Sequence, residues 1–283
     1  SMEKTDLVPG STIDVTITYE NTGDTIVSNV ELGFESESPF FSEENYLVGT
    51  TDYPELNEVE PGESGTVIVS APLRSWISQS ETETYENLLL TTSALSQYTL
   101  GDGTGQRISS GGSQLAFIIT TPVVFESFAR YTAASGDQLG RGPLPPRVGI
   151  ETKYWIFWHI TNTTNSIENL HIEGVLPSNV EFTGRQTVST NAAIDYDETT
   201  RTVSWEASSV EPTLSPSSKV VGMAFEVAIT PTEEHLDSEP TLLQDIFLSG
   251  SDEATGVSLS RYSTDITTNL PSDSSAAGKS IVE

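Results

Sequence analysis

Short segments in which apolar and polar side chains alternate constrain the fold of this chain more than any other feature. Residues 13–20 show the pattern best, because Ile, Val, Ile and Tyr occupy every second position with Asp, Thr, Thr and Glu between them. Successive side chains of a β-strand point to opposite faces, so this period of two predicts a strand with one apolar and one polar face. Strands of this kind along the whole chain predict an all-β protein.

Turn residues separate these segments. Pro9-Gly10 and Pro61-Gly62 each precede an alternating run. Proline presets its φ angle and glycine tolerates positive φ, so both favour turns. The strands predicted by these signals are residues 13–20, 30–34, 66–71, 88–94 and 115–120 in the first half, and 125–132, 154–160, 169–172, 193–206 (a hairpin), 220–229, 242–249 and 257–266 in the second.

The second half of the chain repeats the signals of the first. In each half an alternating strand ends in an Asn-Thr turn, and a second Asn then begins an Asn-apolar-x-apolar strand. The two Asn positions are Asn21 and Asn29 in the first half, and Asn162 and Asn169 in the second. The offset of about 140 residues is the size of one ordinary domain. We therefore predict two domains, 1–122 and 123–271, with residues 272–283 as a linker toward a further repeat.

Other structural classes are excluded by pattern. No stretch offers the ~18 consecutive apolar residues of a membrane helix, and heptad repeats are absent. Direct membrane insertion of these residues is therefore not expected. The segment 136–146 contains too much Gly and Pro for a helix or a central strand, which predicts a long loop inside the second domain.

The chain is strongly acidic, with 41 acidic against 12 basic residues and a net charge of −29. Nucleic acid binding needs clustered Lys and Arg that displace counterions from phosphates, so nucleic acid is excluded as a partner and anionic membrane is disfavoured. The acidity favours solubility, repulsion between neighbouring copies and attraction of divalent cations. The absence of cysteine excludes disulfides, thiol catalysis and cysteine-ligated zinc.

Three motifs together resemble a known family. They are Pro9-Gly10 before an alternating strand that ends in Tyr-x-Asn-x-Gly, the run 169–172 followed by Leu176-Pro177, and the hairpin arm 202–205 (Thr-Val-Ser-Trp) before an acidic, proline-containing turn. These motifs are similar to the Ig-like repeats of bacterial and archaeal cell-envelope proteins, of the conserved-repeat and CARDB-like kind. The resemblance implies tandem immunoglobulin-like β-sandwiches that act as spacers, surface-layer elements or adhesive stalks.

One predicted strand carries aromatic side chains on both faces. Trp155, Phe157 and His159 share one face, and Tyr154 and Trp158 share the other. Either a second sheet and the Gly/Pro loop bury both faces, or one face is an exposed platform for a sugar or a partner protein. We take Trp155, Phe157 and His159 as the candidate binding residues.

The remaining chemistry-bearing residues show no catalytic pattern. His159, His171 and His235 are the only histidines, and their spacing does not predict convergence on a zinc ion or on a nucleophile. We expect all three to be structural. The chain is therefore expected not to be an enzyme, and no catalytic residue is assigned.

Two acidic turns are the candidate metal sites. Asp195, Asp197 and Glu198 surround one turn, and Asp252 and Glu253 lie in another. Calcium takes six to eight oxygen ligands, several from one tight loop, and the chain contains no D-x-D-x-D-G loop. Calcium is thus the one candidate cofactor, and solvated turn residues are the alternative explanation.

These observations lead to one leading hypothesis and two alternatives. The leading hypothesis is an extracellular, non-catalytic module of a cell-surface protein, a spacer, stalk or assembly element whose partners are neighbouring Ig-like repeats. The first alternative is an adhesion module that binds a glycan or a surface protein through the Trp155 face or the loop 136–146. The second is an accessory domain of a larger secreted hydrolase.

Overall fold

The computed structural model describes residues 7–75, 89–101, 104–162, 164–190, 192–212 and 221–283. The chain forms two compact units, Ser1–Thr121 and Pro122–Glu283, which we call unit 1 and unit 2. Helical structure within the described ranges is limited to three short 3-10 turns, Pro54–Asn57 (η1), Glu233–His235 (η2) and Ser274–Ala276 (η3). None of them is long or apolar enough to cross a membrane. The predicted all-β class is confirmed.

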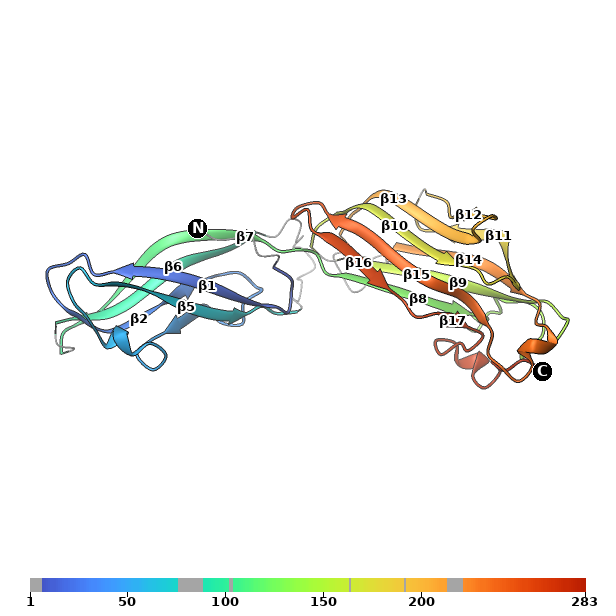
Figure 1. The fold of residues 1–283 in the computed structure, drawn as a ribbon, viewed down its shortest axis with the longest axis horizontal. Helices are drawn as coiled ribbons and strands as arrows, with labels where there is room; N and C mark the ends of the chain where they lie inside the picture. The colour runs from blue at the N-terminus through green and yellow to red at the C-terminus, as the bar shows by residue number, and fades with distance from the viewer. Residues whose placement is uncertain (1–6, 76–88, 102–103, 163, 191, 213–220) are drawn as a thin grey trace. The chain divides into compact units, whose positions relative to one another are not determined.

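Unit 1 consists of two antiparallel sheets of unequal width (Figure 1). The wider sheet has the order β3-β2-β6-β7, and the short strand β4 also pairs with β2. The narrower sheet contains β1 and β5, which pair along their whole length. The strands are Thr12–Glu20 (β1), Val27–Glu35 (β2), Asn45–Val48 (β3), Glu58–Val59 (β4), Ser64–Pro72 (β5), Leu89–Leu100 (β6) and Arg107–Ile118 (β7).

Side chains from both sheets of unit 1 form one apolar core. Ile13 and Val15 of β1 meet Val67 and Val69 of β5 on its inner side, and all four are almost fully buried. Alternation along each strand places these residues on one face, because successive side chains point to opposite sides. An aromatic cluster closes one part of the core, with the rings of Phe34, Phe41 and Tyr46 5.4–5.5 Å apart.

Unit 2 also consists of two antiparallel sheets, and both are wide. One has the order β11-β14-β9-β8, and the other has the order β12-β13-β10-β15-β16, with β17 also paired to β15. The strands are Val123–Arg130 (β8), Thr152–Asn162 (β9), Ile167–Val175 (β10), Val180–Val188 (β11), Asp195–Asp197 (β12), Thr202–Val210 (β13), Val221–Ile229 (β14), Thr241–Asp252 (β15), Ser258–Tyr262 (β16) and Ile266–Thr267 (β17).

The strand order of unit 2 is that of an immunoglobulin domain. In such domains strands A, B, E and D form one sheet and strands C, F and G form the other. In sheet order, β8, β9, β14 and β11 occupy the A, B, E and D positions, and β10, β15 and β16 occupy C, F and G. The β12–β13 hairpin follows strand D and extends the second sheet beside strand C. Unit 1 uses the same plan, with β1 and β5 as B and E, and β2, β6 and β7 as C, F and G.

The core of unit 2 is continuous and closed. Tyr154, Ile156, Trp158 and Ile160 of β9 all have 0% exposure, and Trp205 of β13 is buried from the other sheet. The ring of Trp158 packs edge-on against Phe225 of β14, at a centroid distance of 5.1 Å. Each of these large side chains contributes about 1.5–3 kcal/mol of burial free energy.

The Asn motifs that repeat in the sequence occupy equivalent places in the two units. Asn29 in β2 and Asn169 in β10 both adopt positive φ, 51° and 50°. At each of them the pairing register of the strand shifts, which marks a β-bulge. Asn21 directly follows β1, and Asn162 is the last residue of β9. Both donate an Nδ2 hydrogen bond to a later strand, to the carbonyl of Val59 in unit 1 and of Val210 in unit 2.

Residues 272–283 do not form the expected linker. Ala276 and Val282 are buried, with Ala276 in the core of unit 2. Val282 forms a parallel bridge with Leu236, and the Asp273 carboxylate accepts the backbone N–H groups of Tyr131 and Thr132. The segment packs on unit 2 because some of its apolar side chains are buried there and its one aspartate accepts backbone hydrogen bonds. Its Ser/Ala/Gly-rich composition does not predict these contacts.

Other differences concern single strands. The predicted strand 257–266 is two strands, β16 and β17, interrupted at residues 263–265. The sequence patterns did not predict β3, β4 or β11, which are short or lack a clean alternation. Leu88 and Val220, the expected first residues of two strands, lie outside the described residues.

Candidate functional site

Strand β9 supplies the three candidate binding residues to one face of a sheet. Because Ile156 and Trp158 point into the core, alternation turns Trp155, Phe157 and His159 to the opposite face. All three are half-buried. The structure therefore brings Trp155, Phe157 and His159 side by side along one strand.

The neighbouring strand β8 extends this aromatic row. Phe128 is the register partner of Phe157, and their rings stack at a centroid distance of 5.3 Å and an interplanar angle of 9°. The His159 ring meets Phe128 edge-on at 5.0 Å and Phe157 at 6.1 Å. We call Phe128, Trp155, Phe157 and His159 the aromatic face. Offset and edge-on aromatic pairs of this kind contribute about 0.5–1.5 kcal/mol each beyond burial.

Two arginines flank the aromatic face. The guanidinium of Arg130 lies 5.5 Å from the Phe128 ring centre, and that of Arg185 lies 5.6 Å from the Trp155 ring centre. Both distances fall within the range of cation–π attraction. The aromatic face is thus a strip of rings with a cation at its Phe128 side and another at its Trp155 side.

A buried carboxylate holds Arg185 in place. Glu226 of β14 has a side-chain exposure of 1%, and its Oε1 accepts a hydrogen bond from Arg185 Nη1 at 2.8 Å. Thr183 Oγ1 donates to the other oxygen, Oε2, at 3.0 Å. A carboxylate that is buried needs a charged partner and hydrogen bonds, and Glu226 has both. Because Glu226 is opposite Trp155 in the strand register, this ion pair fixes Arg185 beside the indole ring.

Burial lowers the pKa of His159 below its ordinary value, and this is the largest influence on it. The nearby carboxylate of Glu126 acts in the opposite direction, and the guanidinium of Arg130 reinforces the lowering. His159 is therefore a neutral imidazole at pH 7 that offers one hydrogen-bond donor and one acceptor. An aromatic strip with such a group can stack on the apolar face of a sugar ring or on a partner's side chain.

The other two histidines have separate partners in unit 2. His171 lies on β10, where its ring nitrogens are 3.1 Å from Glu206 and 3.2 Å from Glu173. His235 ends η2, with Nδ1 bonded to Thr232 and Nε2 3.2 Å from Asn179. The three histidines are on different elements, and each has its own local contacts.

The candidate calcium ligands occupy two turns of the same sheet. Asp197 is the last residue of β12, and its Oδ1 accepts the N–H groups of Thr199 and Thr200 at 2.7 and 3.3 Å, which lowers the pKa of this carboxyl. Asp195 and Glu198 are exposed beside it. The Asp197 carboxylate is therefore already used in shaping the β12–β13 turn.

The second acidic turn connects β15 to β16. Asp252 is buried and accepts hydrogen bonds from Asn165 Nδ2 and the Thr255 N–H, both at 2.8 Å, while Glu253 is exposed. Strands β13 and β10 separate this turn's strand, β15, from β12 in the sheet. Among the residues that the structure describes, no three His, Asp or Glu side chains come together in a way that could hold a metal ion. Calcium binding stays a prediction from the sequence.

Several residues of the site were not predicted from the sequence. Phe128, Arg130, Arg185 and Glu226 come from β8, β11 and β14, and only strand pairing shows that they meet β9. A signal for two of them was present, since Glu126, Phe128 and Arg130 alternate along a predicted strand. No comparable signal exists for Arg185, because it lies within the register shift between Phe182 and Gln186 of β11.

Comparisons with known proteins give structural likeness alone. No family model and no curated protein matches the chain. The C-terminal domain of the antigen I/II polypeptide BspA of Streptococcus agalactiae covers 93% of this chain and 94% of its own, with 10% identity and a TM-score of 0.35. The C-terminal domain of the antigen I/II-family protein AspA of Streptococcus pyogenes covers 93% of this chain and 93% of its own, with 10% identity and a TM-score of 0.36.

The major pilin subunit BcpA of Bacillus cereus is a third similar structure, covering 90% of this chain and 69% of its own at 7% identity and a TM-score of 0.30. Identities and TM-scores of this size do not place the chain in the families of these proteins. The resemblance to conserved-repeat and CARDB-like domains likewise stays a prediction from the motifs. The strand order of the units shows the immunoglobulin-like fold.

Proposed function

We propose that this chain is a non-catalytic structural module of a cell-surface protein, in which immunoglobulin-like units serve as spacer, stalk or assembly elements beside neighbouring repeats. The observation that carries the proposal is the way in which the first strand of unit 2 is held. A structural module transmits load through the strands at its ends, so these strands need many bonds to the body of the domain. Strand β8 has such bonds along its length and at both of its ends.

The contacts of β8 come from three places. All eight of its residues pair with β9. At its beginning, Arg261 Nε of β16 donates to the Val123 carbonyl at 3.1 Å. Just past its end, Asp273 Oδ2 accepts the N–H groups of Tyr131 and Thr132 at 2.9 and 2.5 Å. Pulling on β8 therefore loads a full strand ladder together with contacts to β16 and to the segment after the last sheet strand.

Single-molecule pulling on the full chain tests this function. Resistance to force depends on the unfolding rate, which rises when a contact formed in the native state but lost in the transition state is removed. We expect Asp273→Asn to lower the unfolding force of one of the two units, because the acceptor of two buried N–H groups loses its charge. Asp265→Asn is the matched control, since Asp265 is exposed. Equal forces for the two variants would argue against a load-bearing strand β8.

The surface location is tested separately on cells that express the gene. An antibody raised against unit 2 is expected to label intact cells, and external protease is expected to remove the label. Labelling only after permeabilisation would contradict a cell-surface role.

The aromatic face favours a second candidate function, adhesion through a glycan or a protein ligand. Exposed apolar surface bounded by polar groups marks interaction sites, and here a ring strip is bounded by Arg130 and Arg185. Glycan-array binding that is lost in Trp155→Ala and kept in Tyr262→Ala would support adhesion. Tyr262 is a suitable control because it is an exposed aromatic residue of the other sheet, 82% exposed. Binding that is unchanged in Trp155→Ala would exclude the aromatic face as the contact surface.

Calcium binding at the two acidic turns, which only the sequence predicts, is tested separately. A calcium ion that binds only the folded state raises the melting temperature in proportion to the logarithm of its concentration. A thermal midpoint that rises with calcium concentration, and rises less in Asp197→Asn, would support calcium binding at the β12–β13 turn. A thermal midpoint that calcium does not change would argue against calcium binding.

A further inference from the structure

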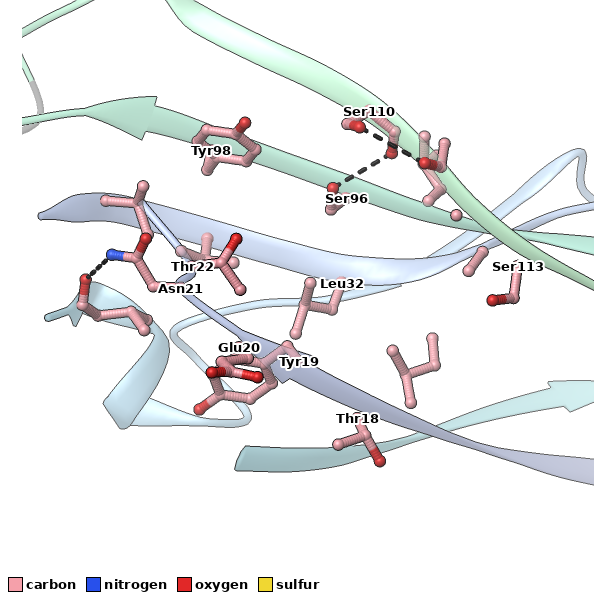
Figure 2. Close-up of a pocket in the computed structure, with 18 of the residues that line it drawn as sticks. Thr18, Tyr19, Glu20, Asn21, Thr22, Leu32, Ser96, Tyr98, Ser110 and Ser113 are labelled. Carbon is pink, nitrogen blue, oxygen red and sulfur yellow. Dashed lines mark hydrogen bonds between the residues drawn. The ribbon is translucent and has the colours of Figure 1, made fainter. Parts of the chain in front are cut away.

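Unit 1 contains a long hollow between its two sheets, with a volume of about 1210 Å³. One wall is β1, and the floor and opposite wall come from β2, β6 and β7. Figure 2 shows Tyr19 and Thr18 of β1, Leu32 of β2, and Tyr98 and Ser110 of the other strands around it. Sites for small molecules have volumes of roughly 300–1,000 Å³, so this hollow is larger than such a ligand needs.

The hollow exists because the sheet of β1 is narrow and because β7 has small side chains. Among the described residues, β1 pairs with β5 on one side and has no strand on the other. Across the opening, residues 109–113 of β7 read Ser-Ser-Gly-Gly-Ser. Ser110 is opposite Ser96 in the strand register, and both of these small residues line the hollow. Side chains that would fill this space are absent from the sequence of β7.

Apolar side chains of the core border the opening as a result. Ile13 and Val15 are buried, whereas Ile17 and Tyr19, farther along the same face of β1, are half-buried. Tyr98 of β6 and Leu115 of β7 are half-buried in the same way, and all four belong to the margin of the core. The free edge of β1 therefore runs beside an unfilled apolar space, which is the arrangement that accepts an added strand.

Charge at the opening has one sign. Asp14, Glu20 and Asp24 line the hollow, and no Lys or Arg is among its lining residues. Asp14 and Glu20 lie on the outer face of β1, opposite in direction to Val15 and Ile17. On an antiparallel or parallel neighbour of β1, outward side chains would come beside these carboxylates. Opposite charges at such cross-strand positions are stabilising, and like charges are destabilising.

We propose that the free edge of β1 accepts an extended segment of a partner polypeptide in which apolar and basic residues alternate. Its apolar side chains enter the hollow beside Ile17 and Leu32, and its basic side chains lie beside Asp14 and Glu20. A second copy of this chain is a poor occupant, because each copy carries a net charge of −29. The proposal rests on unit 1 and is independent of the load-bearing role proposed for unit 2.

A synthetic peptide tests the proposal with the full chain. The probe is a nine-residue peptide in which valine and lysine alternate, matching the nine residues of β1, and binding is measured by isothermal titration calorimetry. We expect one peptide to bind per chain, with affinity that falls as salt screens the charges. A peptide of alternating valine and glutamate is the charge control, and a peptide with four lysines followed by five valines is the pattern control. Neither control peptide is expected to bind comparably.

Three variants locate the bound peptide. Ser110→Val adds volume to the hollow and is expected to weaken binding at least tenfold, whereas Ser109→Val, on the opposite face of β7 and outside the lining, keeps it. Glu20→Gln removes one carboxylate and is expected to weaken binding about threefold. Circular dichroism checks that each variant is folded.

Each remaining outcome overturns the proposal. These outcomes are no binding of the valine–lysine peptide, equal binding by Ser110→Val, and equal binding of the valine–glutamate peptide. Self-association of the chain that Ser110→Val abolishes would assign the edge to a second copy instead.

Discussion

Strands β1 and β9 occupy the same position in the two units and show the same alternation, yet they differ in burial. All four inward residues of β9, from Tyr154 to Ile160, have 0% exposure. In β1 the inward residues Ile13 and Val15 are buried, and Ile17 and Tyr19 are only half-buried. Alternation therefore decides which face of a strand turns inward, while the neighbouring strands decide whether that face is covered.

The covering strands explain the difference between the units. In unit 2, β9 lies between β8 and β14, and the facing sheet is closed by the β12–β13 hairpin. In unit 1, β1 lies at an edge and faces the small residues 109–113 of β7. Unit 2 thus has a closed core, and unit 1 has an open one.

The largest expected effect comes from truncating equivalent isoleucines. Ile156→Ala leaves a cavity in a closed core and is expected to lower the free energy of unfolding of unit 2 by about 2–5 kcal/mol. Ile17→Ala removes a side chain that already borders the hollow, so the loss in unit 1 is expected to be about 1 kcal/mol. Urea titration followed by hydrogen exchange of peptides from each unit measures both values. Equal losses would show that the two cores are equally closed.

A second pair adds volume instead of removing it. Gly174→Val in unit 2 is expected to cost about 1–3 kcal/mol, because a Cβ there would lie 3.0 Å from Leu243. Ser110→Val in unit 1 adds apolar volume beside the hollow and places a β-branched residue in a strand, so it is expected to stabilise unit 1 by about 0.5–1 kcal/mol. The same urea titration applies. A destabilised Ser110→Val chain would contradict the open core.

The Asn motifs provide a comparison in which the units should behave alike. Asn21→Ala and Asn162→Ala each leave a strand carbonyl without its Nδ2 donor, at Val59 and at Val210 respectively. We expect each to cost about 1–2 kcal/mol in its own unit, measured by thermal unfolding. A loss in one unit alone would mean that the repeated motif has different roles in the two.

The smallest effect concerns pH. Burial lowers the pKa of His159, so the folded chain releases this proton more readily than the unfolded chain. The neutral ring then contributes fully to stability above the unfolded pKa of about 6.5, and this contribution decreases as the pH falls through that value toward the folded pKa. Glu126, Arg130, Phe128, Phe157 and, from β14, Gly222 face the ring.

Comparison of the parent chain with His159→Phe isolates this contribution. The difference in free energy of unfolding between the two is expected to favour His159→Phe increasingly as the pH falls from about 7 to about 5. A difference that is constant over this range would show that His159 has the same pKa in both states.

The sequence predicted the fold class and most strands because period-two alternation reports the facing of each residue directly. It also placed Trp155, Phe157 and His159 on one face for the same reason. The sequence did not predict which strands contact one another. Phe128 and Arg185 join the aromatic face only through pairing of β8, β9, β14 and β11, which single-strand patterns do not encode.

The open edge of unit 1 could not be predicted from the sequence for a similar reason. The run of Ser and Gly at 109–113 lacks the apolar alternation of a core strand, so its place in the sheet depends on pairing with β6. The segment 272–283 shows the reverse, since a composition typical of a linker packs onto unit 2 through Asp273, Ala276 and Val282.

Hydrogen exchange of the intact chain, read for β1 and β9 under native conditions, tests the contrast between the two units most directly. Amides in a closed core exchange only when the whole unit unfolds, whereas those at an open edge exchange through local opening. We predict that the amides of β9 exchange at the rate of global unfolding of unit 2. The amides of β1 are expected to exchange faster than those of β6, the strand of unit 1 that we expect to be most protected. Protection of β1 equal to that of β6 would contradict the open edge.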